Sequence, residues 1–162
     1  MKIVTFLLLS LSLASATFSA SSLQHEVADI VRIKEFSLKR TVILQGYDVV
    51  SYQAEGVAQE GSKKHAAKYK AVMYYFANAQ NKAIFEAAPE RYEPLYGGWC
   101  AYAMLEGGKT KANPKSFKIV DNRLLVFYDG VWGDTRKLWN EMTDKEAERI
   151  ATADSEWAKH LK

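Results

Sequence analysis

The sequence predicts a small, single-domain α+β protein, and three patterns indicate this class. Short apolar runs separated by Gly, Asn and Asp are typical of antiparallel strands and hairpins. One mid-chain segment and one C-terminal segment carry apolar residues at helical spacing. The chain has 162 residues, which suffices for one domain with its own core, and neither a repeat nor a linker divides it.

The first residues have the features of a secretory signal peptide. Lys2 precedes an apolar run from Ile3 to Leu13 that is too short to span a membrane, and small residues follow. The small residues at Ala14 and Ala16 predict cleavage after Ala16; cleavage after Ala20 and an uncleaved N-terminal anchor are the alternatives. Cleavage implies a secreted or periplasmic protein. We therefore expect three parts: a signal peptide at 1–16, a lead-in without clear periodicity at 17–40, and a folded domain at 41–160.

Strands are expected in the first part of this domain. β-branched residues on both sides of Gly46 predict two short strands within residues 41–52. The polar, glycine-containing stretch 53–65 predicts a surface loop. Residues 67–76 alternate loosely and are rich in Tyr, which indicates a further strand.

A helix and a hairpin are expected next. Asn78 is a suitable N-cap for a helix with apolar residues spaced over residues 79–87, and Pro89 ends that helix. Residues 116–128 hold two apolar runs joined by Asp121 and Asn122, which tolerate positive φ, and this predicts a hairpin.

The C-terminal segment is expected to be an amphipathic helix. Thr143 and Glu146 have the spacing of a capping box. One helical face follows, made of Ala147, Ile150, Ala151, Asp154 and Trp157.

Composition limits the partners and the redox chemistry. The net charge is only +3, one unit of which is Lys2, so no nucleic-acid partner is indicated. A single cysteine, Cys100, excludes an internal disulfide, and the fold must depend on its apolar core. The part after the signal peptide contains no stretch long and apolar enough to be a transmembrane segment.

Common enzyme motifs are absent from the sequence. It contains no Gly-x-Ser-x-Gly, no phosphate-binding glycine loop, no His-Glu-x-x-His and no Cys-x-x-Cys. A thiol-dependent enzyme would need Cys100 within hydrogen-bond reach of His65 or His160. The alternatives for Cys100 are a small core residue and, if it is exposed, an intermolecular disulfide.

Five segments together, in this order, carry a family resemblance. The chain resembles the secreted YHS-domain-containing proteins, and the resemblance covers residues 41–160. The usual proline of the Gly-Tyr-Asp-Pro-Val motif is replaced by Val49. The segments are GYDVVSY (46–52), KHAAKYKAVMYYFANAQNKAIFEAAPERY (64–92), YGGWCAYA (96–103), NPKSFKIVDNRLLVFY (113–128) and ADSEWAKH (153–160).

The resemblance implies metal-related binding, because the wider YHS family includes metal-handling modules of heavy-metal pumps. The three cysteine positions of those modules fall on Ser51, Ala77 and Asn81, and only the histidine is kept, as His65. Alanine has no donor atom, and serine and asparagine are hard donors, so the thiol site of those modules is expected to be lost.

Cys100 is the remaining candidate for a soft-metal ligand. With His65 it would form a tentative metal site, and Met73 or Met104 would add a thioether. Such a donor set suits Cu(I), so copper or another soft metal is the cofactor to test. Filling of the apolar core is the alternative for both methionines.

A small-ligand site is the other possibility. Tyr47, Asp48, Tyr96 and Trp99 would offer flat apolar faces with polar handles, as ligand pockets do. Alternatively, Asp48 caps its own turn, and the pair Gly97–Gly98 makes a tight corner that leads into a buried strand.

The function that we expect from the sequence is therefore an exported, non-catalytic binding or accessory module. Its cargo would be a soft metal or a small ligand, and the sequence identifies no particular protein partner. The alternatives are a thiol-dependent enzyme that uses Cys100 and a purely structural or partner-binding domain.

Overall fold

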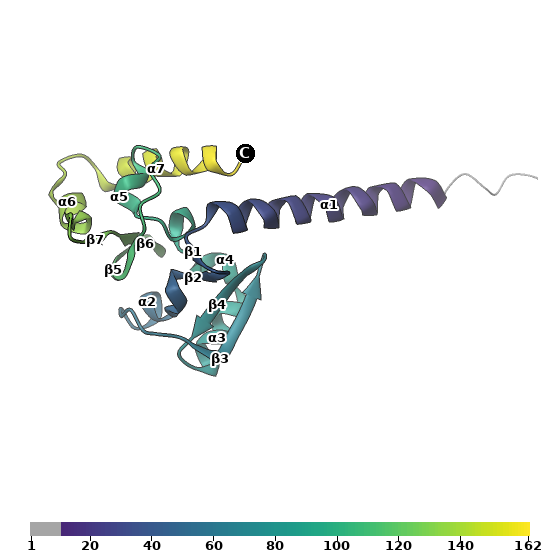
Figure 1. The fold of residues 1–162 in the computed structure, drawn as a ribbon, viewed down its shortest axis with the longest axis horizontal. Coiled ribbons are helices and arrows are strands. Elements are labelled where there is room, and N and C mark those ends of the chain that lie inside the picture. The colour runs from purple at the N-terminus through teal and green to yellow at the C-terminus, as the bar shows by residue number, and fades with distance from the viewer. Residues whose placement is uncertain (1–10) are drawn as a thin grey trace, which may run out of the picture.

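A long helix, α1 (Leu11–Glu35), projects from a globular part made by the rest of the chain (Figure 1). The computed structural model describes residues 11–162, with side chains from Ala20 onward, and the α+β class is confirmed. Residues 1–10 of the expected signal peptide lie outside the described residues, and residues 11–16 form the start of α1. Within the described part, no helix combines the length and the apolar character that crossing a membrane requires.

The lead-in, for which the sequence showed no clear periodicity, is helical up to Glu35. Between Leu11 and Glu35 there is neither Gly nor Pro, and two cations, Arg32 and Lys34, lie in the last turn, where they favour the helix dipole. The helix is fixed to the globular part at this end, since Phe36 packs against Trp157 with ring centroids 5.7 Å apart.

The first sheet has four strands in the order β1-β2-β4-β3, and only the β2–β4 pair is parallel. The single strand expected at 67–76 is wrong, because the chain reverses at Lys70 and Ala71, which both have positive φ. The strands are β1 (Leu38–Lys39), β2 (Val42–Ile43), β3 (Ser62–Tyr69) and β4 (Val72–Phe76).

The second strand expected within 41–52 is also wrong. After β2 the chain forms the 3-10 turn η1 (Leu44–Gly46) and the short helix α2 (Ser51–Ala54). Val49 and Val50 are fully buried at the turn into α2, so their β-branched side chains serve the core rather than a strand.

The mid-chain helix is confirmed as α3 (Ala79–Ala87). The side chain of Asn78 accepts a hydrogen bond of 2.8 Å from the backbone N–H of Asn81, as an N-cap does. A short helix, α4 (Pro89–Tyr92), begins at Pro89, and the 3-10 turn η2 (Leu95–Gly98) follows it.

The predicted hairpin is confirmed as β5 (Asn113–Val120) and β6 (Arg123–Phe127), with Asp121 and Asn122 at positive φ in its turn. A second, smaller hairpin follows, made by β7 (Asp129–Gly130) and β8 (Gly133–Asp134). The buried strand expected after Gly97–Gly98 is instead the short helix α5 (Ala101–Met104).

The chain ends with α6 (Thr135–Glu141) and α7 (Glu146–His160). The capping box is wrong, because the N-cap of α7 is Lys145 and not Thr143. The buried residues of α7 are Arg149, Ile150 and Ala153, whereas Ala147 and Ala151 of the expected apolar face are exposed.

Strand β6 lies between two clusters of buried side chains. Leu124 and Val126 belong to the cluster under the four-stranded sheet, while Leu125 and Phe127 belong to the cluster around α5, α6 and α7. This alternation follows from the two-residue period of a strand. The partly buried Trp157 packs against both clusters. Figure 1 shows the corresponding two parts of the globular region, below and above β6.

Candidate functional site

The carboxylate of Asp48 is the centre of the Gly-Tyr-Asp turn and is fully buried. One of its oxygens accepts hydrogen bonds from the N–H groups of Val50 and Ser51, at 2.9 and 3.4 Å. The other accepts from the N–H of Ala77 at 2.9 Å and from the side-chain amide of Asn81 at 2.7 Å. A buried charge needs such donors, and these ones join α2, the end of β4 and α3.

The hydroxyl of Ser51 completes this network. It lies 2.8 and 2.9 Å from the carbonyl oxygens of Asp48 and Val57, and it accepts a hydrogen bond from the N–H of Gln59. Asp48 therefore does cap its own turn, but it also binds residues 29 and 33 positions further along the chain.

The three positions that the resemblance matches to cysteines thus meet at one place, around Asp48. The donor atoms there do not fit a soft metal: Ala77 offers a backbone N–H, Asn81 offers an amide N–H, and the hydroxyl of Ser51 is engaged with carbonyl groups. Among the residues that the structure describes, no group of three or more His, Cys, Asp and Glu side chains could hold a metal ion.

Cys100 is fully buried and lies in the corner before α5. Its sulfur is 3.3 Å from the hydroxyl of Thr135, and that hydroxyl donates to the carbonyl of Tyr128 at 2.8 Å. Because the hydroxyl proton is used in this way, the thiol is the donor in the Cys100–Thr135 bond. Cys100 therefore has the environment of a small core residue.

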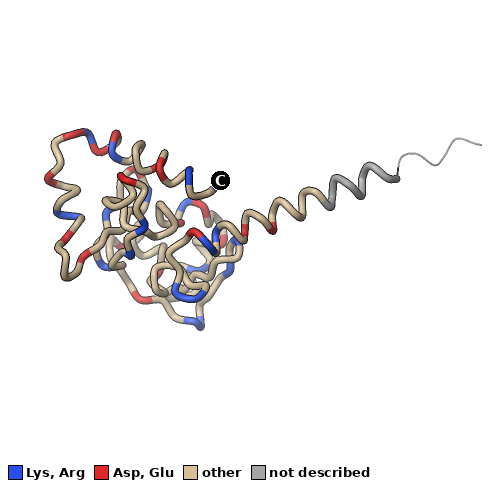
Figure 2. Tube along the Cα trace, turned by 45° about the horizontal axis from the view of Figure 1, so that its top comes forward, with Lys and Arg blue, Asp and Glu red and all other residues tan. Residues whose placement is uncertain are grey.

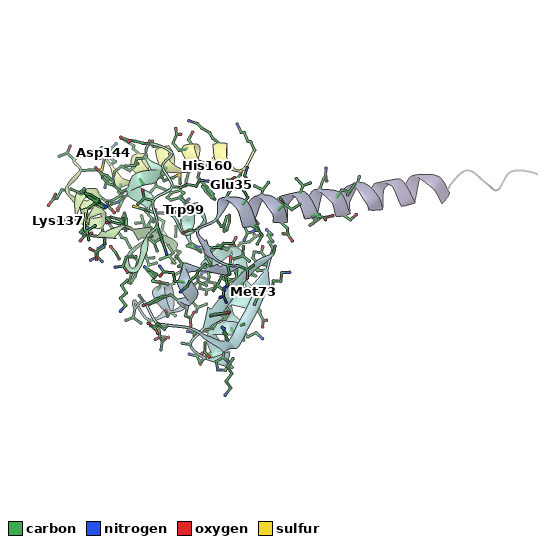
Figure 3. The ribbon with its side chains drawn as sticks, in the orientation of Figure 1. Glu35, Met73, Trp99, Lys137, Asp144 and His160 are labelled. Carbon is green, nitrogen blue, oxygen red and sulfur yellow. The ribbon has the colours of Figure 1, made fainter. Side chains whose placement is uncertain are left out.

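Two of the other tentative metal ligands, His65 and Met73, lie on different elements from Cys100, whereas Met104 is one helical turn after it and donates its backbone N–H to the carbonyl of Cys100 at 3.1 Å. His65 is on β3 and Met73 on β4, both in the four-stranded sheet, whereas Met104 is a fully buried member of the cluster around α5. Figure 3 shows Met73 in the lower part of the molecule and Trp99, the neighbour of Cys100, above it beside the end of α1. The structure does not assemble a Cys100–His65 centre.

The three aromatic residues of the tentative ligand site, Tyr47, Tyr96 and Trp99, do not share one pocket and have different neighbours. The hydroxyl of Tyr47 donates to Glu60 at 3.3 Å, and the indole N–H of Trp99 donates to the carbonyl of Glu35 at 2.6 Å. Tyr96 is buried, and burial raises the pKa of its hydroxyl. Of these residues, only Tyr96 reaches a large groove.

That groove lies between α1 and the C-terminal end of α7, and Figure 1 shows this end of α7 above the last turns of α1. Its volume is about 1010 Å³. Apolar side chains from three parts of the chain line it: Leu23, Val27 and Val31 from α1; Leu95 and Tyr96 from η2; and Trp157 and Leu161 from the C-terminal segment.

Ion pairs surround the apolar lining. Arg32 binds Glu93, which also accepts a hydrogen bond from the hydroxyl of Tyr74. Arg123 binds Asp154 through both of its terminal nitrogens, at 2.7 and 2.9 Å.

A third pair joins Lys70 and Glu90 at 2.8 Å. Its hydrogen bond lowers the pKa of Glu90, so this carboxyl stays ionised. Each charge of these three pairs is therefore matched by an opposite charge of the chain itself, while Asp29 and Lys162 also line the groove outside these pairs.

Sequence reasoning missed this groove because its walls are far apart in the chain. No clear periodicity was found in the lead-in at 17–40, and no role was assigned to Leu161. The available signal was the spacing of Leu23, Val27 and Val31, which repeats every four residues as on one helical face.

Comparison with known proteins found no match for this chain among protein-family models, curated proteins or solved structures.

Proposed function

We propose that the chain is a non-catalytic binding module and that the groove between α1 and α7 holds a small, apolar, uncharged molecule. The observation that carries the proposal is the pairing of an apolar lining with a rim of matched ion pairs. A charged ligand at one of these three pairs would have to displace a partner, whereas an uncharged ligand gains from burial against the apolar lining alone.

The size of the groove supports a ligand of moderate size. Its volume of about 1010 Å³ is at the upper end of the range of about 300–1,000 Å³ that is usual for small-molecule pockets. The groove is long because it follows α1 from Leu23 to Arg32 and continues to Phe36 beyond the helix, so an elongated molecule fits better than a compact one.

The resemblance to secreted YHS-domain proteins supports an exported accessory role for such a module. A soft metal is not part of the proposal, because Cys100 is buried against Thr135 at the start of α5 and His65 lies on β3. The thiol-dependent enzyme is not proposed either, since no imidazole is among the hydrogen-bond partners of the described Cys100 sulfur.

Titration with N-phenyl-1-naphthylamine, an uncharged apolar fluorophore, tests the proposal. We expect its emission to rise on binding and to saturate at one site. Leu161→Asp puts a charge into the groove and should weaken binding at least about tenfold. The matched control is Leu138→Asp, because Leu138 is 44% exposed, close to the 42% of Leu161, and lies on α6 outside the groove. Equal affinities for the two variants, or no saturable binding, would overturn the proposal.

A further inference from the structure

A small hollow lies where the turns η1 and η2 meet. All three residues of η1 and the last three of η2 have positive φ, so the backbone is left-handed in both turns. The turns are in contact, since a Cβ on Gly98 would lie 3.1 Å from the side chain of Leu44. Leu44 and Gln45 are not glycines, so this conformation costs free energy, and strain of this kind is often stored at binding sites.

The hollow has a volume of about 120 Å³, and several segments of the chain line it. Its polar side chains are Ser37 and Lys39 in and before β1, Gln45 in η1 and Lys111 before β5. These segments are joined here, because the side-chain amide of Gln45 donates to the carbonyl of Ala112 at 3.5 Å. The described residues that line the hollow include two lysines and no Asp or Glu, so the hollow is cationic.

Cations are concentrated in the two segments that bring these lysines together. Neither residues 36–47 nor residues 107–120 contain an Asp or a Glu, although they hold two and four Lys or Arg residues. The net charge of the whole chain is only +3, so the excess is local. By contrast, α7 carries both signs, which Figure 2 shows as red and blue along one helix. A local excess of positive charge attracts anions.

The charges of Lys39 and Lys111 are not used within the fold. Within the part of the chain that the structure describes, neither lysine forms an ion pair, whereas Lys109, two residues before Lys111, binds Glu35. Two like charges at one small hollow repel each other, and an anion bound there replaces this repulsion by attraction to both lysines.

We propose that this hollow binds a phosphate group. Lys39 and Lys111 balance its charge, which is about −1.5 to −2 for a phosphate ester at pH 7. Lysine is a common phosphate ligand, since its ammonium group combines a positive charge with three donors. The hydroxyl of Ser37 and the side-chain amide of Gln45 are further donors for the phosphate oxygens.

The size of the hollow supports a small anion. Pockets for organic ligands have volumes of about 300–1,000 Å³, whereas about 120 Å³ corresponds to the space of roughly four water molecules at about 30 Å³ each. One phosphorus atom and its oxygens fit this space. A free phosphate ion and the phosphate group of a larger molecule, whose remainder stays outside the hollow, present the same chemistry to it.

This site goes beyond the proposed groove and can fail independently of it, because none of the described residues lines both. Lys111→Gln should leave the binding of N-phenyl-1-naphthylamine unchanged. Leu161→Asp should leave the binding of phosphate unchanged.

Equilibrium dialysis of the full chain against radiolabelled inorganic phosphate at low ionic strength tests the proposal. We expect saturable binding of one phosphate per chain, with a dissociation constant that rises at least about tenfold in Lys39→Gln and in Lys111→Gln, since each loses a hydrogen bond to a charged group. Glycerol 1-phosphate distinguishes the two sources of the phosphate group. It should bind more tightly than inorganic phosphate if the ligand is a larger molecule, and more weakly if the ligand is the free ion.

Lys115→Gln is the matched control, because it removes the same charge from an exposed lysine of the same segment that does not line the hollow. It should change the dissociation constant by less than about twofold. Lys39 and Lys111 are exposed as well, so circular dichroism should show the same folded state in all variants. The absence of saturable binding, an equal loss in Lys115→Gln and Lys111→Gln, or equally strong competition by acetate would each overturn the proposal.

Discussion

The side-chain amide of Asn81 donates a hydrogen bond of 2.7 Å to the carboxylate of Asp48, and both residues are buried. This bond joins the first turn of α3 to the turn that precedes α2, across 33 residues of sequence. The same carboxylate oxygen accepts the N–H of Ala77. Positions 51, 77 and 81, which the resemblance matches to metal-binding cysteines, thus provide hydrogen-bond donors to one buried carboxylate here.

Replacement of Asn81 by Asp should destabilise the fold in a pH-dependent way. Two carboxylates at this distance cannot both be ionised, so the pKa of one is raised in the folded state. A carboxyl whose pKa is raised by folding stabilises the folded state at low pH. This stabilisation is lost as the pH rises through the folded-state pKa. We expect Asn81→Asp to cost about 3 kcal/mol at pH 8 and clearly less at pH 5, measured by urea unfolding. Asn78→Asp, which keeps the exposed N-cap acceptor, is the control, and the same pH profile in both variants would contradict this account.

The corner at Gly97 should tolerate no side chain. Its φ is +56°, and a Cβ there would lie 2.7 Å from ring atoms of Phe36. Gly56 has a similar φ of +69° with nothing within 4 Å of its Cβ position. Gly56→Ala therefore measures backbone strain alone, about 1 kcal/mol, whereas Gly97→Ala should cost about 3 kcal/mol because Phe36 must also move. Equal losses in thermal unfolding would show that the Phe36 contact relaxes without cost.

The thiol of Cys100 should be unreactive in the folded protein. It is fully buried and donates to Thr135, so iodoacetamide can reach it only when the structure opens. Mass spectrometry should detect no alkylation after an hour in native buffer at pH 7.5 and complete alkylation in denaturing urea. A native rate similar to that of free cysteine would support the thiol-dependent enzyme instead.

Features that depend on neighbouring residues were predictable from the sequence. Asn78 caps α3 and Pro89 ends it, because capping and the loss of an N–H are local effects. The β5–β6 turn was predictable for the same reason, since Asp121 and Asn122 adopt positive φ readily.

Features that depend on tertiary packing were not predictable. Lys70 and Ala71 are not typical turn residues, yet they take positive φ because β3 must return beside β4. Val49 and Val50 resemble strand residues, but the hydrogen bonds from the N–H groups of Val50 and Ser51 to Asp48 hold the chain here in the turn into α2. The groove joins α1 to Leu161, and no local pattern indicates that these segments meet.

Glu35 and Lys109 form a contact at the junction of α1 and the globular part. This contact should make the stability of the folded protein depend on pH. Lys109 donates a hydrogen bond of 2.6 Å to Glu35, and this bond lowers the pKa of Glu35. His160 also faces this carboxylate, with its Nδ1 3.9 Å away (Figure 3). A lowered folded pKa contributes stability that is present above the ordinary pKa of 4.5 and is lost as pH falls through the folded value.

Lys109→Met removes this contribution, so it should lower the free energy of unfolding at pH 7 by up to about 1 kcal/mol, since Lys109 is partly exposed to solvent. The difference from the unaltered chain should shrink as pH falls below 4.5 and through the lowered pKa of Glu35, because Glu35 becomes protonated in both proteins only below that lowered pKa. Lys159→Met is the matched control: Lys159 binds Glu156 at the same distance of 2.6 Å, but on the exposed surface of α7. Urea unfolding from pH 3 to pH 7 measures both variants. If Lys159→Met lowers the free energy of unfolding equally and with the same pH dependence, the burial of Glu35 adds nothing to this ion pair. If only Lys109→Met shows this loss, the Glu35–Lys109 ion pair stabilises the attachment of α1 to the rest of the fold.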